Sequence, residues 1–127
     1  MIAFALAMLV QVDPMEPTSE ESCRVFAERV FAQADTSAGD GTQTSLSYKT
    51  HFRQSDSSCY IVVTAVLSRD GVVHRQSTGL FTSDGNIPLY EVVLQDGKPD
   101  HCDDDGGQCM NSQAAFDSAV APFMTGD

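Results

Sequence analysis

Between residues 18 and 34 the apolar positions recur at helical intervals. They are Cys23, Phe26, Ala27, Val30, Phe31 and Ala34. Thr18 and Glu21 have the spacing of a capping box and directly follow Pro17. The pattern therefore predicts a helix that begins at Thr18 and carries one apolar stripe. The small and polar residues from 35 to 42 favour turns, so we expect the main internal loop there.

From Leu46 to Leu94 the apolar residues take the spacing of strands. Residues 59–67 are rich in β-branched side chains, and both alternating faces are apolar. This is typical of a central strand that is covered on both sides.

Three Asp-Gly pairs, at 70–71, 84–85 and 96–97, mark turns along this part of the chain. They delimit two further strands, from Val72 to about Phe81 and from Leu89 to Leu94. Residues 98–102 contain a proline and can form an edge strand at most. The connections are too short for helical crossovers, so the sheet should be an antiparallel meander.

The last apolar pattern is helical again and is capped by Asn111 or Ser112. It consists of Phe116, Ala119, Val120, Phe123 and Met124. Pro122 removes a backbone donor, so we expect a kink or an end near Ala121. The predicted fold class is α+β: an N-terminal helix, a three- to four-stranded antiparallel meander, and a C-terminal helix packed on the sheet.

The chain opens with an apolar run, Met1 to Val10, which is too short to span a membrane. It fits the apolar region of a signal peptide but lacks the basic residue that normally precedes one. A short hydrophobic element packed on the domain is the alternative. We expect residues 1–14 to be a signal-peptide remnant or linker, and residues 15–127 to be a single globular domain.

The chain is strongly acidic, with 18 acidic residues against 7 basic ones and a formal net charge of −11. This charge disfavours binding to nucleic acid and to anionic membrane surfaces. It fits either plain solubility or a surface for a basic partner, and the sequence leaves both open. We expect a monomer that does not span a membrane.

Four cysteines behind a leading apolar run are typical of a small exported domain held by disulfides. We therefore expect Cys23, Cys59, Cys102 and Cys109 to form disulfides in a secreted or periplasmic protein. Reduced buried thiols, or thiols bound to a metal, are the alternative.

The sequence offers only weak candidates for a metal-binding or catalytic site. The carboxylates of Asp100 and residues 103–105 lack the spacing of an EF-hand. His101, Cys102 and Cys109 lack the paired spacing of a zinc site. Cys59, with His51 as its base, is a candidate thiol nucleophile, but it enters the most apolar strand, where thiols are usually inert or bridged. We predict no catalytic residue, no metal site and no cofactor.

Several segments resemble a family of small, secreted, uncharacterised bacterial proteins. His51-Phe52, six residues and then Cys59-Tyr60-Ile61-Val62 is similar to its His-Tyr-x6-Cys-Phe-Val-Leu segment. Residues 23–31 resemble its opening helix, 92–102 its hairpin, and 112–124, with Phe116-Asp117 and Phe123-Met124, its closing helix. The resemblance implies export and a helix-sheet-helix layout, and it implies no activity.

The chain departs from this family in its cysteines. Tyr90 stands where the family carries a cysteine, and the additional Cys109 follows an insertion at residues 103–108. One cysteine is lost and another is gained, which suggests that one disulfide of the family is formed with a different partner in this chain. Of the three possible connectivities we expect Cys23–Cys59 and Cys102–Cys109, and the other two stay open.

The function that these features predict is a non-enzymatic binding or envelope-associated module, whose partner would be a protein or an envelope component. A small extracytoplasmic hydrolase or metal-binding protein is the alternative. A pocket that gathers His51, His74 or His101 with an acid would favour the enzyme.

Overall fold

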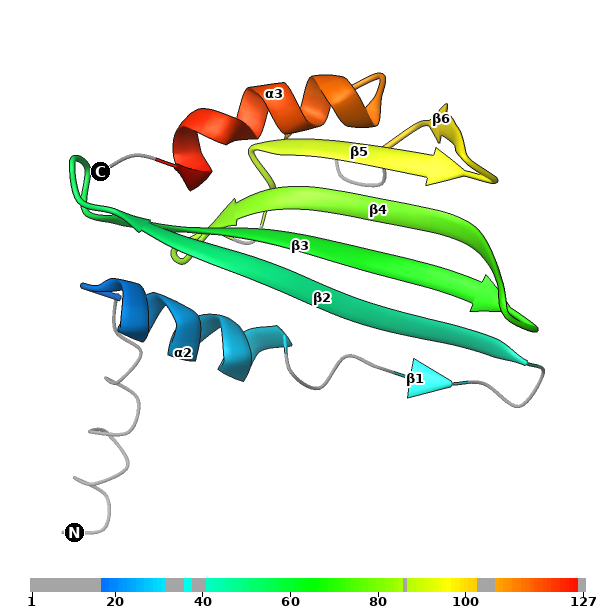
Figure 1. Cartoon of the computed structure of the whole chain (residues 1–127), viewed down its shortest axis with the longest axis horizontal. Helices are drawn as coiled ribbons and strands as arrows, with labels where there is room; N and C mark the ends of the chain where they lie inside the picture. The colour runs from blue at the N-terminus through cyan, green and yellow to red at the C-terminus, as the bar shows by residue number, and fades with distance from the viewer. Residues whose placement is uncertain (1–16, 32–35, 38–40, 86, 103–106, 126–127) are drawn as a thin grey trace, which may run out of the picture.

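The computed structural model describes residues 17–31, 36–37, 41–85, 87–102 and 107–125 (Figure 1). Helix α2 (Glu20–Phe31) opens the described chain and helix α3 (Gln113–Met124) closes it. Between them lie β1 (Thr36–Ser37), β2 (Thr42–Arg53), β3 (Ser58–Arg69), β4 (Val72–Thr82), β5 (Tyr90–Gln95), β6 (Lys98–Asp100) and β7 (Gln108–Cys109). The predicted helix-sheet-helix order is confirmed. The expected leader, residues 1–14, lies outside the described residues.

The strands form one sheet in the order β1-β2-β3-β4-β5-β6, and each neighbouring pair is antiparallel. Strands β3, β4 and β5 form the predicted meander, and β2 is a further long strand that the sequence pattern did not delimit. Two of the predicted turns, Asp70-Gly71 and Asp96-Gly97, have positive φ at both residues, as tight hairpins of this kind require. Strand β7 pairs with β5 in the parallel direction, which the sequence did not predict. Strand β1 lies within the segment expected to be a loop, and that expectation was wrong at residues 36–37.

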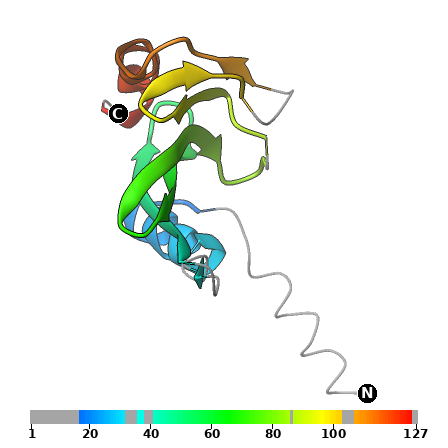
Figure 2. The same ribbon diagram turned by 90° about the vertical axis from the view of Figure 1, so that its right-hand side faces the viewer.

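The two helices cover opposite faces of the sheet. Figure 1 shows α2 beside β2 and α3 beside β5, and Figure 2 shows the sheet between them. Because side chains alternate along a strand, β3 contributes Cys59, Ile61 and Val63 to one face and Tyr60 and Val62 to the other. The prediction of a central strand covered on both sides is therefore confirmed.

The face under α2 holds the first core. Cys23 and Ala27 of the helix are fully buried against the first set of β3 side chains. The Sγ atoms of Cys23 and Cys59 form a disulfide, with the two Cα atoms 5.5 Å apart. This pairing is the expected one, and it fastens the helix to the middle of the sheet.

The face under α3 holds the second core. Phe116 and Val120 of the helix pack against Tyr60, Leu80 and Val92, which come from three different strands. Phe116 and Val92 are each 1% exposed, so this helix is fixed by apolar burial without a covalent bond to the sheet beneath it.

The start of α2 differs from the prediction by one or two residues. Ser19, and not Thr18, caps the helix: its Oγ accepts a hydrogen bond from the backbone N–H of Ser22 at 3.1 Å. The hydroxyl of Ser22 in turn accepts the backbone N–H groups of Ser19 and Thr18. Serine oxygens thus replace the Glu21 carboxylate of the predicted capping box.

The end of α3 also differs. The expectation was a kink or an end near Ala121, and the end is wrong because the helix continues through Pro122 to Met124. Pro122 lies in the last turn, so the helix loses only the hydrogen bond that its N–H would have donated to the carbonyl of Ser118, an exposed residue. The start is as predicted, with Ser112 as the cap and its Oγ accepting from the N–H of Ala115 at 3.0 Å.

Within the described residues, neither helix is long and apolar enough to cross a membrane. Both helices have 12 residues, well short of the ~20 that a spanning helix needs.

Candidate functional site

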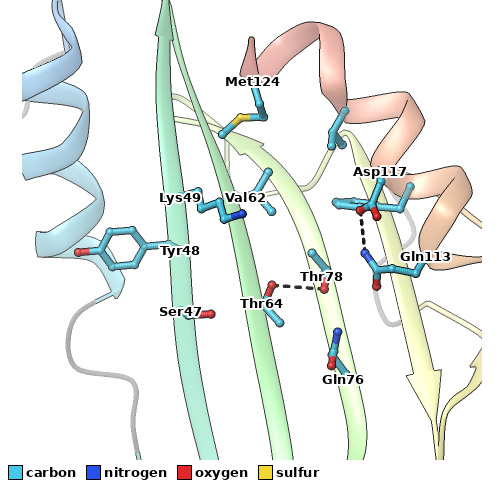
Figure 3. Close-up of a pocket in the computed structure, with 12 residues that line it drawn as sticks. Ser47, Tyr48, Lys49, Val62, Thr64, Gln76, Thr78, Gln113, Asp117 and Met124 are labelled. Carbon is cyan, nitrogen blue, oxygen red and sulfur yellow. Dashed lines mark hydrogen bonds between the residues drawn. The ribbon is translucent and has the colours of Figure 1, made fainter.

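A groove of about 360 Å³ lies between α3 and the uncovered part of the sheet. Its lining comes from β2, β3, β4 and α3 (Figure 3). The residues are Ser47, Tyr48, Lys49, Val62, Thr64, Gln76, Thr78, Gln113, Phe116, Asp117, Val120 and Met124. Figure 3 shows the ring of Tyr48 pointing away from the groove toward α2, so Tyr48 borders the groove with its backbone and not with its ring.

The floor of the groove is a row of hydroxyl groups set by strand register. Ser47 pairs with Thr64, and Thr64 pairs with Thr78, so the three side chains lie side by side on one face. The hydroxyls of Thr64 and Thr78 lie 3.4 Å apart and share a hydrogen bond. Ser47 and Lys49 lie on the same face of the sheet as α3, and both are exposed. The floor therefore offers both donors and acceptors.

The helical wall mixes apolar and polar side chains. Phe116 and Val120 of α3 are part of the lining, and Met124 lies at one end of the groove (Figure 3). Above them the amide nitrogen of Gln113 donates to the carboxylate of Asp117 at 3.0 Å. Lys49 stands on the facing wall. The groove can thus bury an apolar group while holding a polar group by hydrogen bonds.

Arg53, at the end of β2, fixes the C-terminal end of this wall. Its guanidinium donates to the carbonyl oxygen of Pro122 at 3.1 Å and to the carboxylate of Asp56 at 2.9 Å. The same group lies 5.2 Å from the centre of the Tyr60 ring and 5.0 Å from that of Phe123. One side chain therefore joins a strand end to the last turn of α3 by hydrogen bonding and cation–π contact.

Asp56 and Tyr60 are the described residues whose ionisation is clearly shifted. The phenol of Tyr60 donates to the carboxylate of Asp56 at 2.6 Å. This hydrogen bond, together with Arg53, lowers the pKa of Asp56 below 3.8. Burial, and then the same hydrogen bond, raises the pKa of Tyr60 above 10.0. The pair is structural, because it lies at the turn that supports α3 and outside the lining of the groove.

The other end of α3 is tied down by β7 and a second disulfide. Cys102 is bonded to Cys109, again the expected pair, with the two Cα atoms 5.8 Å apart. Around it, the N–H of Gln108 donates to the carbonyl of Leu89 at 3.0 Å, and that of Met110 to the carbonyl of Glu91 at 2.7 Å. These bonds hold the segment that leads directly into the cap of α3.

The structure places the three histidines apart from one another and outside the groove. Nδ1 of His51 lies 3.6 Å from Glu20, and Nδ1 of His74 lies 3.3 Å from Asp96. Both are pairs at the margins of the sheet. His101 lines a separate depression of about 300 Å³ with Asp100, which is the combination expected of an enzyme, but both residues are exposed. None of the described groove residues is a histidine or a cysteine.

No group of three metal-ligating side chains occurs among the described residues. Asp103, Asp104 and Asp105, the acidic cluster weighed as a cation site, lie outside the described residues. Cys102 and Cys109, the candidate zinc ligands, form a disulfide with each other. Cys59, the candidate nucleophile, forms a disulfide with Cys23.

Sequence reasoning missed the groove. Ser47, Thr64 and Gln76 are ordinary polar positions in three strands, and only their register brings them together. The one available signal was the set of hydroxyl and amide side chains on these strands. That signal can be recognised only when the pairing of the strands is known, because the pairing aligns the side chains in a row.

Comparison with models of protein families, with curated proteins and with solved structures finds no match for this chain.

Proposed function

We propose that the protein is an exported, non-enzymatic binding domain and that the groove beside α3 is its binding site. Two disulfides support the exported setting, since such bonds persist in oxidising compartments. The resemblance to small secreted bacterial proteins points to the same setting.

The observation that carries this proposal is the composition of the groove. Hydroxyl and amide groups on Thr64, Gln76 and Gln113 lie beside the apolar surface of Val62 and Met124. A concave site with an apolar wall and a few polar groups suits a ligand that is partly apolar and largely uncharged. A short peptide segment or a small envelope-derived molecule has this chemistry.

The site can be tested by filling it. In Ser47→Trp, an indole projects from β2 into the groove, whereas in Gln43→Trp it projects from the same exposed face of the same strand, farther along. The chain has no natural tryptophan, so each variant also carries a single tryptophan as a fluorescent probe. Both substitutions are on the surface and should leave the fold intact.

A library of small, half-apolar fragments is then screened by amide chemical shifts. Binding fragments should shift the amides of Thr64, Gln76 and Thr78 together. In Ser47→Trp the same fragments should bind at least about 10-fold more weakly, a change of about 1.4 kcal/mol, while Gln43→Trp should bind them normally. Shifts that avoid these strands, or equal weakening in both variants, would show that the groove is not the site.

A further inference from the structure

The two disulfides have opposite surroundings. Cys23 is 0% exposed and Cys59 is 1% exposed, so both sulfurs lie inside the first core. Cys109 is exposed and Cys102 is half-buried, so the second bridge lies at the surface. Thiol-disulfide exchange requires a thiolate to reach a sulfur, and exposed bridges are accordingly the labile ones.

The fold also accommodates the reduced form of the surface bridge. Sγ of Cys102 lies 3.5 Å from the carbonyl oxygen of Glu91. A bridged sulfur carries no proton, so this is only a contact in the oxidised protein. After reduction the thiol gains a proton and can donate it to the same oxygen, without any other group having to move.

We propose that Cys102–Cys109 is a thiol-exchange site for a dithiol, and that its opening releases the N-terminal end of α3. A thiolate of the dithiol attacks Sγ of Cys109. The bond between the two protein sulfurs breaks, and Cys102 leaves with the electron pair and takes a proton from water. The second thiol of the reagent then closes a cyclic disulfide and expels Cys109 as a thiol, so two electrons pass to the protein.

The consequence follows from what the bridge holds. Gln108, inside the closed loop, bonds to Leu89 just before β5, and Met110, directly after the loop, bonds to Glu91 of β5. Ser112, the cap of α3, comes two residues after Met110. Opening the loop loosens this end of the helix, whereas the Arg53 contact with Pro122 still holds the other end. The groove would thus widen at the end that Gln113 lines. The proposal of an exchange site does not depend on the proposed function. Only the effect of the exchange on ligand binding rests on that function.

Selectivity is measured on the full chain with dithiothreitol as the dithiol, in native buffer. Samples are quenched with iodoacetamide over time and mapped by mass spectrometry. We expect Cys102 and Cys109 to be alkylated at least about 100-fold faster than Cys23 and Cys59, since the buried sulfurs react only when the core opens. Denaturant should abolish the difference. Equal rates in native buffer, or a surface bridge that resists reduction, would overturn the exchange site.

The release of α3 is read out by amide hydrogen exchange on the selectively reduced protein. The amides of Gln108 and Met110 should lose protection, and that of Thr125, at the Arg53 end, should keep it. The double variant Cys102→Ser, Cys109→Ser should give the same pattern without reductant, which separates the effect from the reagent. Unchanged protection at Gln108 and Met110 would overturn the release. Because no ligand is used, failure of the groove as a binding site would not affect either result.

Discussion

At the scale of single residues, the hydrogen bond between Tyr60 and Asp56 makes stability depend on pH at both ends of the range. The pKa of Asp56 is lowered, so its contribution is present above the ordinary value of 3.8 and is lost as pH falls through the lowered value. The pKa of Tyr60 is raised, so its contribution is present below 10.0 and is lost as pH rises through the raised value.

Replacing the phenol should weaken both effects. In Tyr60→Phe the ring still packs on Phe123, but the carboxylate of Asp56 loses its strongest donor. We expect the pKa of Asp56 to rise toward 3.8, as measured by a carboxyl NMR titration, and the alkaline loss of stability to weaken. Tyr48→Phe, on the other face of the sheet, is the matched control and should change neither. An unshifted Asp56 in Tyr60→Phe would mean that Arg53 alone sets its ionisation.

Gly107 is fixed by close packing. A Cβ at this position would overlap the carbonyl oxygen of Pro88, a backbone atom that cannot move aside. Gly107→Ala should therefore lower the free energy of unfolding by about 1 to 3 kcal/mol, measured by urea denaturation. It should also displace β7, seen as a shifted amide of Gln108. Ser118→Ala, on the exposed side of α3, is the control and should have little effect.

At the scale of elements, each helix is fastened by a different kind of interaction. A disulfide holds α2 to β3, whereas apolar burial and Arg53 hold α3. Arg53→Lys keeps the charge but removes the planar group that both donates to Pro122 and stacks on two rings. We expect a loss of about 1 to 2 kcal/mol in urea denaturation.

The control for this prediction is Arg24→Lys. Arg24 pairs with Glu21 and Glu28 on the exposed side of α2, where ion pairs contribute little. Its unfolding midpoint should stay close to that of the natural chain. Equal losses in the two variants would indicate that charge, and not the stacked guanidinium, is what matters at Arg53.

The two disulfides should also differ in how much they stabilise the fold. The first closes a loop with a sequence separation of 36 residues and the second one of 7. In the chain-entropy model these loops are worth about 4 and about 2.5 kcal/mol. Urea denaturation of Cys23→Ser, Cys59→Ser and of Cys102→Ser, Cys109→Ser should therefore show the larger loss in the first pair. The reverse order would mean that strain or packing outweighs loop entropy.

The sequence predicted the elements whose period and turn residues agree. The apolar run of β3, the Asp-Gly turns and the stripe of α3 each have one strong local cause. The sequence did not predict the elements that depend on long-range contacts. Strands β1 and β7 have two residues each and form only because β2 and β5 are available to pair with them. The groove belongs to the same class, since Ser47 and Gln113 meet only after the sheet and helix are assembled.

At the scale of the whole molecule, a net charge of −11 on 127 residues implies self-repulsion in the compact state. Screening of the charges by added salt should weaken this repulsion. We expect the melting temperature to rise as NaCl is increased from about 0.02 M to about 0.5 M, where the Debye length becomes short. The same series with KCl controls for effects of the individual cation. A falling melting temperature would show that attractive ion pairs outweigh the repulsion.

Neighbouring residues of β2 contact the outer ends of both helices. The backbone N–H of Phe52 donates to Glu20, in the first turn of α2, at 2.9 Å, and Arg53 binds the last turn of α3. The first turn of α2 and the last turn of α3 therefore lie at the same end of the sheet, on its two faces (Figure 1). A short linker could join them, and the chain could be reopened at the exposed Asp70-Gly71 turn without cutting any core strand. The fold is thus suited to circular permutation, with new termini at the end of the sheet farthest from both helix anchors.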